Sequence, residues 1–111
     1  MSNVVRIVGV STRGSFDMPI TFEVVLQDEC IKRQMHFGFR ACEGEIYPFV
    51  LQRDGTVDFG SDCTNPENRY VRTNIMEKTI QIGELFTMEE LDDENGGRAE
   101  FTYRIQKVER V

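Results

Sequence analysis

The chain of 111 residues contains no tryptophan, only one histidine and no long run of apolar residues. No segment approaches the ~18 apolar residues that a membrane-spanning helix requires. The N-terminal Met1-Ser2-Asn3 leads directly into strand-like sequence, without the basic start and apolar core of a secretion signal. We therefore expect no membrane association and a cytoplasmic location.

Cysteine is also scarce. Cys30, Cys42 and Cys63 cannot all pair within one chain, and without an export signal free thiols are expected. The spacing of Cys30, His36 and Cys42 fits no compact zinc knuckle, in which two ligands lie two to four residues apart. The acidic run at residues 92–97 does not align with an EF-hand loop. We expect neither a bound metal nor another cofactor.

Basic residues are outnumbered, with 13 Lys and Arg against 19 Asp and Glu, which gives a net charge of −6. This balance argues against a nucleic-acid partner, because binding to the phosphate backbone depends on Lys and Arg. Between Lys78 and Arg98 the sequence contains acids and no base, which favours a basic protein as partner. The alternative is a solvated loop that keeps the protein soluble. The candidate binding residues in this acidic stretch are Glu89, Glu90, Asp92 and Asp93.

The strongest positive signal is a period of two in hydropathy, seen at residues 20–27, 34–41 and 99–106. Further strands are expected at residues 4–10, 45–51, 56–59, 69–73 and 78–82, with the first of these central in the sheet. The pattern predicts an all-β single domain of about eight antiparallel strands, either a small barrel or a sandwich. In its last third, at residues 78–108, the pattern resembles the hairpin arrangement of small SH3-like barrels.

The alternation also assigns faces to the strands. His36 and Arg40 are placed on the polar, solvent-facing side of their strand. Thr87 and Glu90 have the spacing of a capping box, so residues 88–93 are expected to form one short helical turn or an open acidic loop. The residues predicted to face the core are Phe22, Val24, Phe37, Phe39, Phe101 and Tyr103.

One turn can be predicted in detail. A three-residue loop that ends at a left-handed Gly55 pairs Leu51 with Val57 and Phe49 with Phe59, so that apolar residues meet. A two-residue loop would mix the two faces. Gly83, where the alternation falters, predicts a bulge or a bend.

Surface features suggest what the domain does. Pro48 removes a ladder donor, so its strand is expected at an edge or with that position facing outward. Ile46 and Val50 on this strand are candidate contact residues for a protein partner, unless a second layer covers them.

We therefore expect a non-enzymatic domain that binds a protein or self-associates, through the strand edge and the acidic stretch. We assign no catalytic residue. The alternative is a small enzyme or ligand-binding barrel whose pocket uses His36, Arg40 and a carboxylate.

Overall fold

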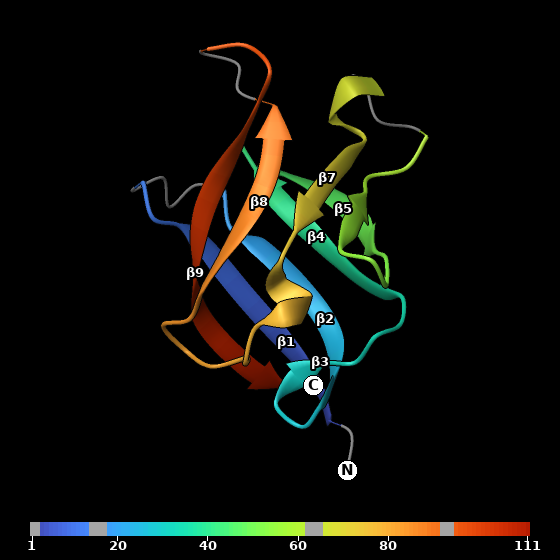
Figure 1. Cartoon of the computed structure of the whole chain (residues 1–111), viewed down its shortest axis with the longest axis vertical. Coiled ribbons are helices and arrows are strands. Elements are labelled where there is room, and N and C mark those ends of the chain that lie inside the picture. Colours follow the sequence, from blue (N-terminus) through green and yellow to red (C-terminus); the bar gives the residue numbers. More distant parts are fainter. Residues whose placement is uncertain (1–2, 14–17, 62–65, 92–94) are drawn as a thin grey trace.

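The computed structural model describes residues 3–13, 18–61, 66–91 and 95–111 (Figure 1). Two single-turn 3-10 helices accompany the strands in this part of the chain: η1 at Pro66–Asn68 and η2 at Ile75–Glu77. The strands are β1 Asn3–Ser11, β2 Ile20–Gln27, β3 Cys30–Ile31, β4 His36–Cys42, β5 Glu45–Leu51, β6 Thr56–Asp58, β7 Tyr70–Thr73, β8 Leu85–Leu91 and β9 Arg98–Arg110.

The strands close into an antiparallel barrel of eight strands. With β3 left aside, each strand pairs with the next one along the chain, from β1 and β2 through β4 to β9. Strand β9 then pairs with β1 and closes the ring. Strand β3 is an additional strand that pairs with the end of β2. The all-β prediction is confirmed, and of its two architectures the barrel is the one observed.

The turn between β5 and β6 matches its prediction. Leu51 pairs with Val57, and Gly55 adopts a left-handed φ of 93°. The N–H of Gly55 donates to the carbonyl of Gln52 (3.0 Å), which closes the turn, and the N–H of Gln52 donates to the carbonyl of Thr56 (2.7 Å). The three-residue loop is therefore confirmed.

The strand predicted at residues 78–82 is not present. This segment follows η2 and makes a single isolated bridge, between Thr79 and Cys30. Ile80 is buried and its N–H donates to the carbonyl of Glu29 (2.8 Å), whereas Ile82 is 70% exposed. Two residues that would share one side of a strand thus lie in different environments. The bend predicted at Gly83 is confirmed by a turn in which that glycine has a φ of 94°.

The helical turn predicted at residues 88–93 is also wrong as far as residue 91, because this stretch belongs to β8. Phe86 and Met88 point into the barrel and are buried. Thr87, which the sequence pattern placed at a helix N-terminus, instead lies in the middle of β8. Its N–H donates to the side-chain oxygen of Asn74 (2.8 Å). Burial of alternate residues outweighed the local capping pattern.

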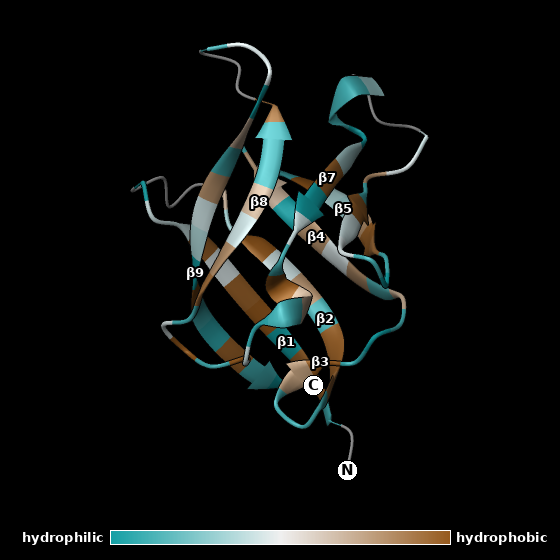
Figure 2. Ribbon diagram, viewed as in Figure 1, coloured by the Kyte–Doolittle hydropathy of each residue, from teal (hydrophilic) through white to brown (hydrophobic). Residues whose placement is uncertain are grey.

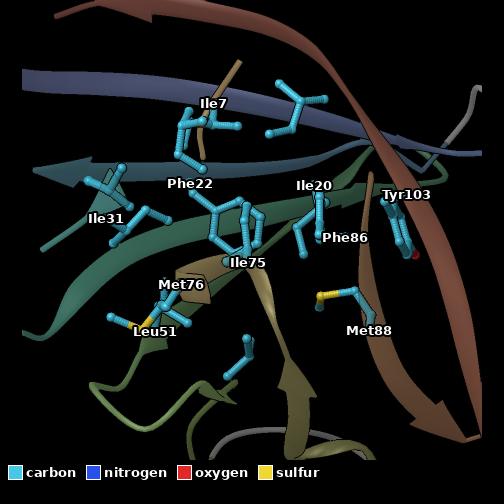
Figure 3. Packing of buried hydrophobic residues seen from close by; sticks show 14 of the residues in the cluster. Ile7, Ile20, Phe22, Ile31, Leu51, Ile75, Met76, Phe86, Met88 and Tyr103 are labelled. Atoms are coloured by element: carbon cyan, nitrogen blue, oxygen red, sulfur yellow. The ribbon is translucent and has the colours of Figure 1, made fainter. Parts of the chain in front are cut away.

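Apolar side chains fill the barrel, as expected for an eight-stranded ring (Figure 3). The ring of Phe22 lies edge-on to those of Phe49 and Phe86, with centroids 5.4 and 5.8 Å away. Bands of alternating hydropathy along β1 and β2 are visible in Figure 2. The buried cluster consists of Val5, Ile7, Ile20, Phe22, Val24, Ile31, Phe49, Leu51, Val57, Val71, Ile75, Met76, Ile80, Phe86, Met88, Tyr103 and Ile105.

Strand β4 faces the opposite way from the prediction. Gly38 lies between Phe22 of β2 and Phe49 of β5 in one inward row. A Cβ atom at Gly38 would stand 2.5 Å from the Phe49 ring and 2.3 Å from the Thr21 carbonyl oxygen. The interior has room here only for a residue without a side chain, and Gly38 therefore faces inward.

The prediction that Phe37 and Phe39 belong to the core is consequently wrong. Phe37 is 63% exposed, and Phe39 is half-exposed outside the buried cluster. His36 and Arg40 were expected to face solvent, but they point inward, on the same side as Gly38. The remaining core assignments hold: Phe22, Val24 and Tyr103 are buried, and Phe101 is partly buried against the cluster.

Candidate functional site

The outer surface of β4 and β5 carries a block of apolar side chains. Because Gly38 and Phe49 form an inward pair, the residues on either side of them point outward. Phe37 and Ile46 are the most exposed, at 63% and 59%. We call this block the apolar face; it consists of three cross-strand pairs, Phe37 with Val50, Phe39 with Pro48, and Ala41 with Ile46.

Both candidate contact residues on β5 belong to the apolar face. Ile46 is exposed and Val50 is half-buried, and no second layer of described residues covers them. Met35, 61% exposed, precedes β4 and extends the face at one end. There it lines a shallow hollow of about 330 Å³ with Gln52, Arg53 and Asp54.

Strand β5 has an open edge along its first half. It pairs with β6 only at Val50 and Leu51, so residues 45–49 have no strand on that side in the described part of the chain. Since Gln52 donates its N–H toward β6, the backbone groups of alternate residues, Val50 and then Pro48, point the same way. Pro48 is exposed and brings no N–H to this edge, as its predicted edge position requires. A proline at an open edge disfavours pairing with a further strand. A partner of β5 would therefore contact its side chains and not its backbone.

Charges of opposite sign lie at the two ends of the apolar face. At the Met35 end, Arg33 donates from Nη1 to the backbone oxygen of Arg53 (3.2 Å), and both residues are exposed. At the other end the turn from β4 to β5 carries the exposed Glu43, while the exposed Glu45 that follows it points to the side of β5 that also carries Tyr47 and Phe49. The Tyr47 hydroxyl donates to Glu45 Oε2 (3.0 Å), and this hydrogen bond raises the pKa of Tyr47.

The predicted acidic site does not form one surface. Glu89 and Glu90 are neighbours on β8, and therefore point to opposite sides of the barrel wall. Glu89 lies outside, in register with Glu100 of β9 and Arg72 of β7, beside a polar cleft of about 230 Å³. Glu90 points inward. Asp92 and Asp93 lie outside the described residues.

Glu90 belongs to a network of three polar side chains inside the barrel. Arg40 donates from Nη1 to Glu90 Oε1 and from Nη2 to the Tyr103 hydroxyl (3.2 Å), which in turn donates to Glu90 Oε2 (3.1 Å). The side chains of Arg40 and Glu90 are only 16% and 15% exposed. Arg40 Nε is buried without a hydrogen-bond partner among the described residues.

Burial shapes the protonation of this network. Burial raises the pKa of the Tyr103 phenol to about 12; the nearby Arg40 opposes the rise and Glu90 reinforces it. For Arg40, burial disfavours the charged guanidinium, but the attraction of Glu90 and Tyr103 outweighs it and the pKa lies above its ordinary value. The network thus holds a cation, a carboxylate and a protonated phenol in fixed positions.

His36 does not join this network. It lies four residues from Arg40 along β4, about 13 Å away at the usual rise of a strand. It is 3% exposed; Nδ1 accepts from the N–H of Val25 (3.4 Å) and Nε2 donates to the carbonyl of Lys32 (2.7 Å). The alternative prediction was a pocket formed by His36, Arg40 and a carboxylate. The structure brings Arg40 and the carboxylate of Glu90 together, whereas His36 bonds to the backbone of Val25 and Lys32.

The thiols give no composite site in the described part of the chain. Cys30 and Cys42 are free and half-buried, and Cys42 Sγ lies 3.3 Å from Met18 Sδ. Cys63 is not among the described residues. No group of three or more His, Cys, Asp or Glu within residues 3–13, 18–61, 66–91 and 95–111 could hold a metal ion. No helix in those ranges has the length and apolar character to cross a membrane.

Comparison with protein-family models, with curated proteins and with solved structures found no match. The geometry of this chain is therefore the basis for assigning its function. Sequence reasoning found Ile46 and Val50 but missed Phe37 and Phe39, which it assigned to the core. The signal that could have found them is Gly38, because a glycine between two alternating aromatic residues can mark the crowded side of a strand.

Proposed function

We propose that this domain is a non-enzymatic protein-binding module, and that the apolar face is its contact surface. One observation carries the proposal: Phe37 and Ile46, both large and apolar, are 63% and 59% exposed on the same outer side of β4 and β5. Contiguous exposed apolar side chains mark surfaces that bind other proteins.

The fold gives these side chains no internal role. The buried cluster is complete on the other side of the strands, where Phe49 and Leu51 pack among its members. Leaving a Phe or Ile in water forgoes about 1.5–3 kcal/mol of burial free energy for each side chain. A partner that covers the apolar face would recover this free energy.

A ligand-binding barrel is the second candidate, supported by the inward network of Arg40, Glu90 and Tyr103. Arg40 Nε, which has no partner among the described residues, is its one free donor there. We prefer the apolar face, since the other polar atoms of the network bond to one another and packed side chains fill the interior next to it.

Affinity capture with the purified chain tests the proposal. The double variant Phe37→Ser/Ile46→Ser removes the most exposed members of the apolar face. Ile82→Ser is the matched control, because Ile82 is 70% exposed but lies in the turn before β8. Proteins retained by the native chain and by the control should be lost from the double variant by at least about tenfold, which corresponds to 1.4 kcal/mol. Retention of the same proteins by all three chains would refute the proposal.

A further inference from the structure

We propose that the partner of the apolar face is a second copy of this chain, packed face to face with β4 and β5 antiparallel to their counterparts. This inference rests on the proposed function. A twofold interface must be complementary to itself, because the same patch serves both subunits. Both the side-chain sizes and the charges of this surface meet that condition.

The side chains match under a twofold rotation whose axis crosses the strands at Phe39 and Pro48. These two residues then lie opposite themselves in the second copy. Phe37 comes opposite Ala41 of the second copy, and Val50 comes opposite Ile46, because the rotation reverses the order of residues along each strand. Apolar meets apolar at every position, and the largest side chain meets the smallest, which favours interdigitation between two layers.

The charges match under the same rotation. It brings the end of the face that carries Arg33 and Arg53 against the end that carries Glu43 in the second copy. Basic residues thus meet an acidic residue at each end of the interface, while Glu45 points to the other side of β5, where it accepts from the Tyr47 hydroxyl. The acid at the basic end, Asp54, accepts the N–H of Thr56 (2.9 Å) and is directed to its own backbone.

The flank and the edge of the surface fit the same arrangement. Glu23, in register with Phe37, already forms an ion pair with Arg6 of its own chain (3.0 Å) and leaves no uncompensated charge. Pro48 blunts the open edge of β5, which disfavours growth of the sheet from edge to edge. Two copies would therefore associate by packing one apolar face against the other. A contact of this twofold kind uses the same surface on both chains, so assembly stops at the dimer.

A charge-swap experiment tests this arrangement by sedimentation equilibrium. Variant A is Arg33→Glu/Arg53→Glu, which makes both ends of the face acidic, and variant B is Glu43→Lys, which makes both ends basic. The native chain should show the mass of two chains. Each variant alone should dissociate at least about tenfold more readily, and an equal mixture of A and B should recover the mass of two chains.

A control variant separates local from overall charge. Arg104→Glu/Arg110→Glu changes two exposed residues of β9 and, like variant A, takes the net charge from −6 to −10. It should remain a dimer. Far-UV circular dichroism of every variant should match the native spectrum, since all the changed residues are exposed.

The outcomes separate this inference from the proposed function. A native chain with the mass of one chain at all concentrations would overturn the dimer, and so would a mixture of A and B that fails to recover two chains. If the capture experiment still depends on Phe37 and Ile46 in that case, the face binds a different protein and the proposed function stands. If capture is also insensitive to those residues, both proposals fail.

Discussion

The inner and outer sides of β4 and β5 are both aromatic, yet they meet different demands. Inside, Gly38 and Phe49 pack so closely that the space for even one methyl group is taken. Outside, Phe37 lies one residue away with 63% of its surface exposed. Packing inside the barrel accounts for the aromatic residues of the inner side but not for the exposed Phe37 on the outer side.

The same contrast recurs elsewhere in the barrel wall. On β8, Glu90 is held inside by Arg40 and Tyr103, whereas its neighbour Glu89 lies outside. Among the tyrosines, Tyr103 is 4% exposed and Tyr70 is 46% exposed. Each pair offers one residue type in two environments, so matched substitutions can measure what the inner position contributes.

The largest difference in the free energy of unfolding is expected between variants of the inner and the outer phenylalanine. Phe49→Ala should lower the free energy of unfolding by about 3–5 kcal/mol, because it opens a cavity beside Phe22 and Phe59. Phe37→Ala should lower it by less than about 1 kcal/mol, since an exposed ring leaves no cavity. Urea midpoints of the two variants, measured on dilute protein that sediments with the mass of one chain, check this. Equal losses for the two variants would contradict the assignment of faces.

Sequence reasoning predicted most of the strands because alternation depends only on local spacing. It assigned the wrong side of residues 34–41 to the core, since a period of two fits either side equally well and the aromatic side was taken as the inner one. The decision depends on Phe22 and Phe49, which flank Gly38 in the barrel and leave it no room. That information is not local to the strand.

The candidate site was predictable in part for the same reason. Ile46 and Val50 emerged from the pattern around Pro48, and the structure places both on the apolar face. Glu89 and Glu90 formed one acidic group in the sequence, but a strand divides adjacent residues between its two sides. The partner of Glu90 is Arg40, fifty residues away along the chain, and no local pattern could reveal it.

The second largest difference in the free energy of unfolding is expected between variants of Glu90 and Glu89. Glu90→Gln leaves the Arg40 cation inside the barrel without its anion and should cost about 2–3 kcal/mol of stability, at the low end for a buried pair because some solvent reaches it. Glu89→Gln should change stability by less than about 0.5 kcal/mol. Urea unfolding at pH 7 provides the measurement.

A double substitution distinguishes lost charge pairing from a general disturbance of packing. In Arg40→Met/Glu90→Gln the uncompensated cation is gone, so the double variant should be more stable than Glu90→Gln alone. If the double variant instead loses, relative to the native chain, the sum of the losses of Arg40→Met and Glu90→Gln, the two groups act independently.

The smallest expected effect is a loss of stability at alkaline pH, which depends on the buried tyrosine. Burial raises the pKa of Tyr103 to about 12, whereas an unfolded tyrosine titrates near 10. Below pH 10 both states keep the phenolic proton, and the stabilisation is fully present. Between pH 10 and pH 12 the unfolded state loses this proton while the folded state retains it, so stability should fall by about 2 kcal/mol over that range. Urea midpoints at intervals from pH 9 to pH 12 should fall less steeply for Tyr103→Phe than for the native chain. The exposed Tyr70→Phe control keeps Tyr103 and should retain the native steepness, and a Tyr103→Phe chain with that same steepness would show that the alkaline loss arises elsewhere.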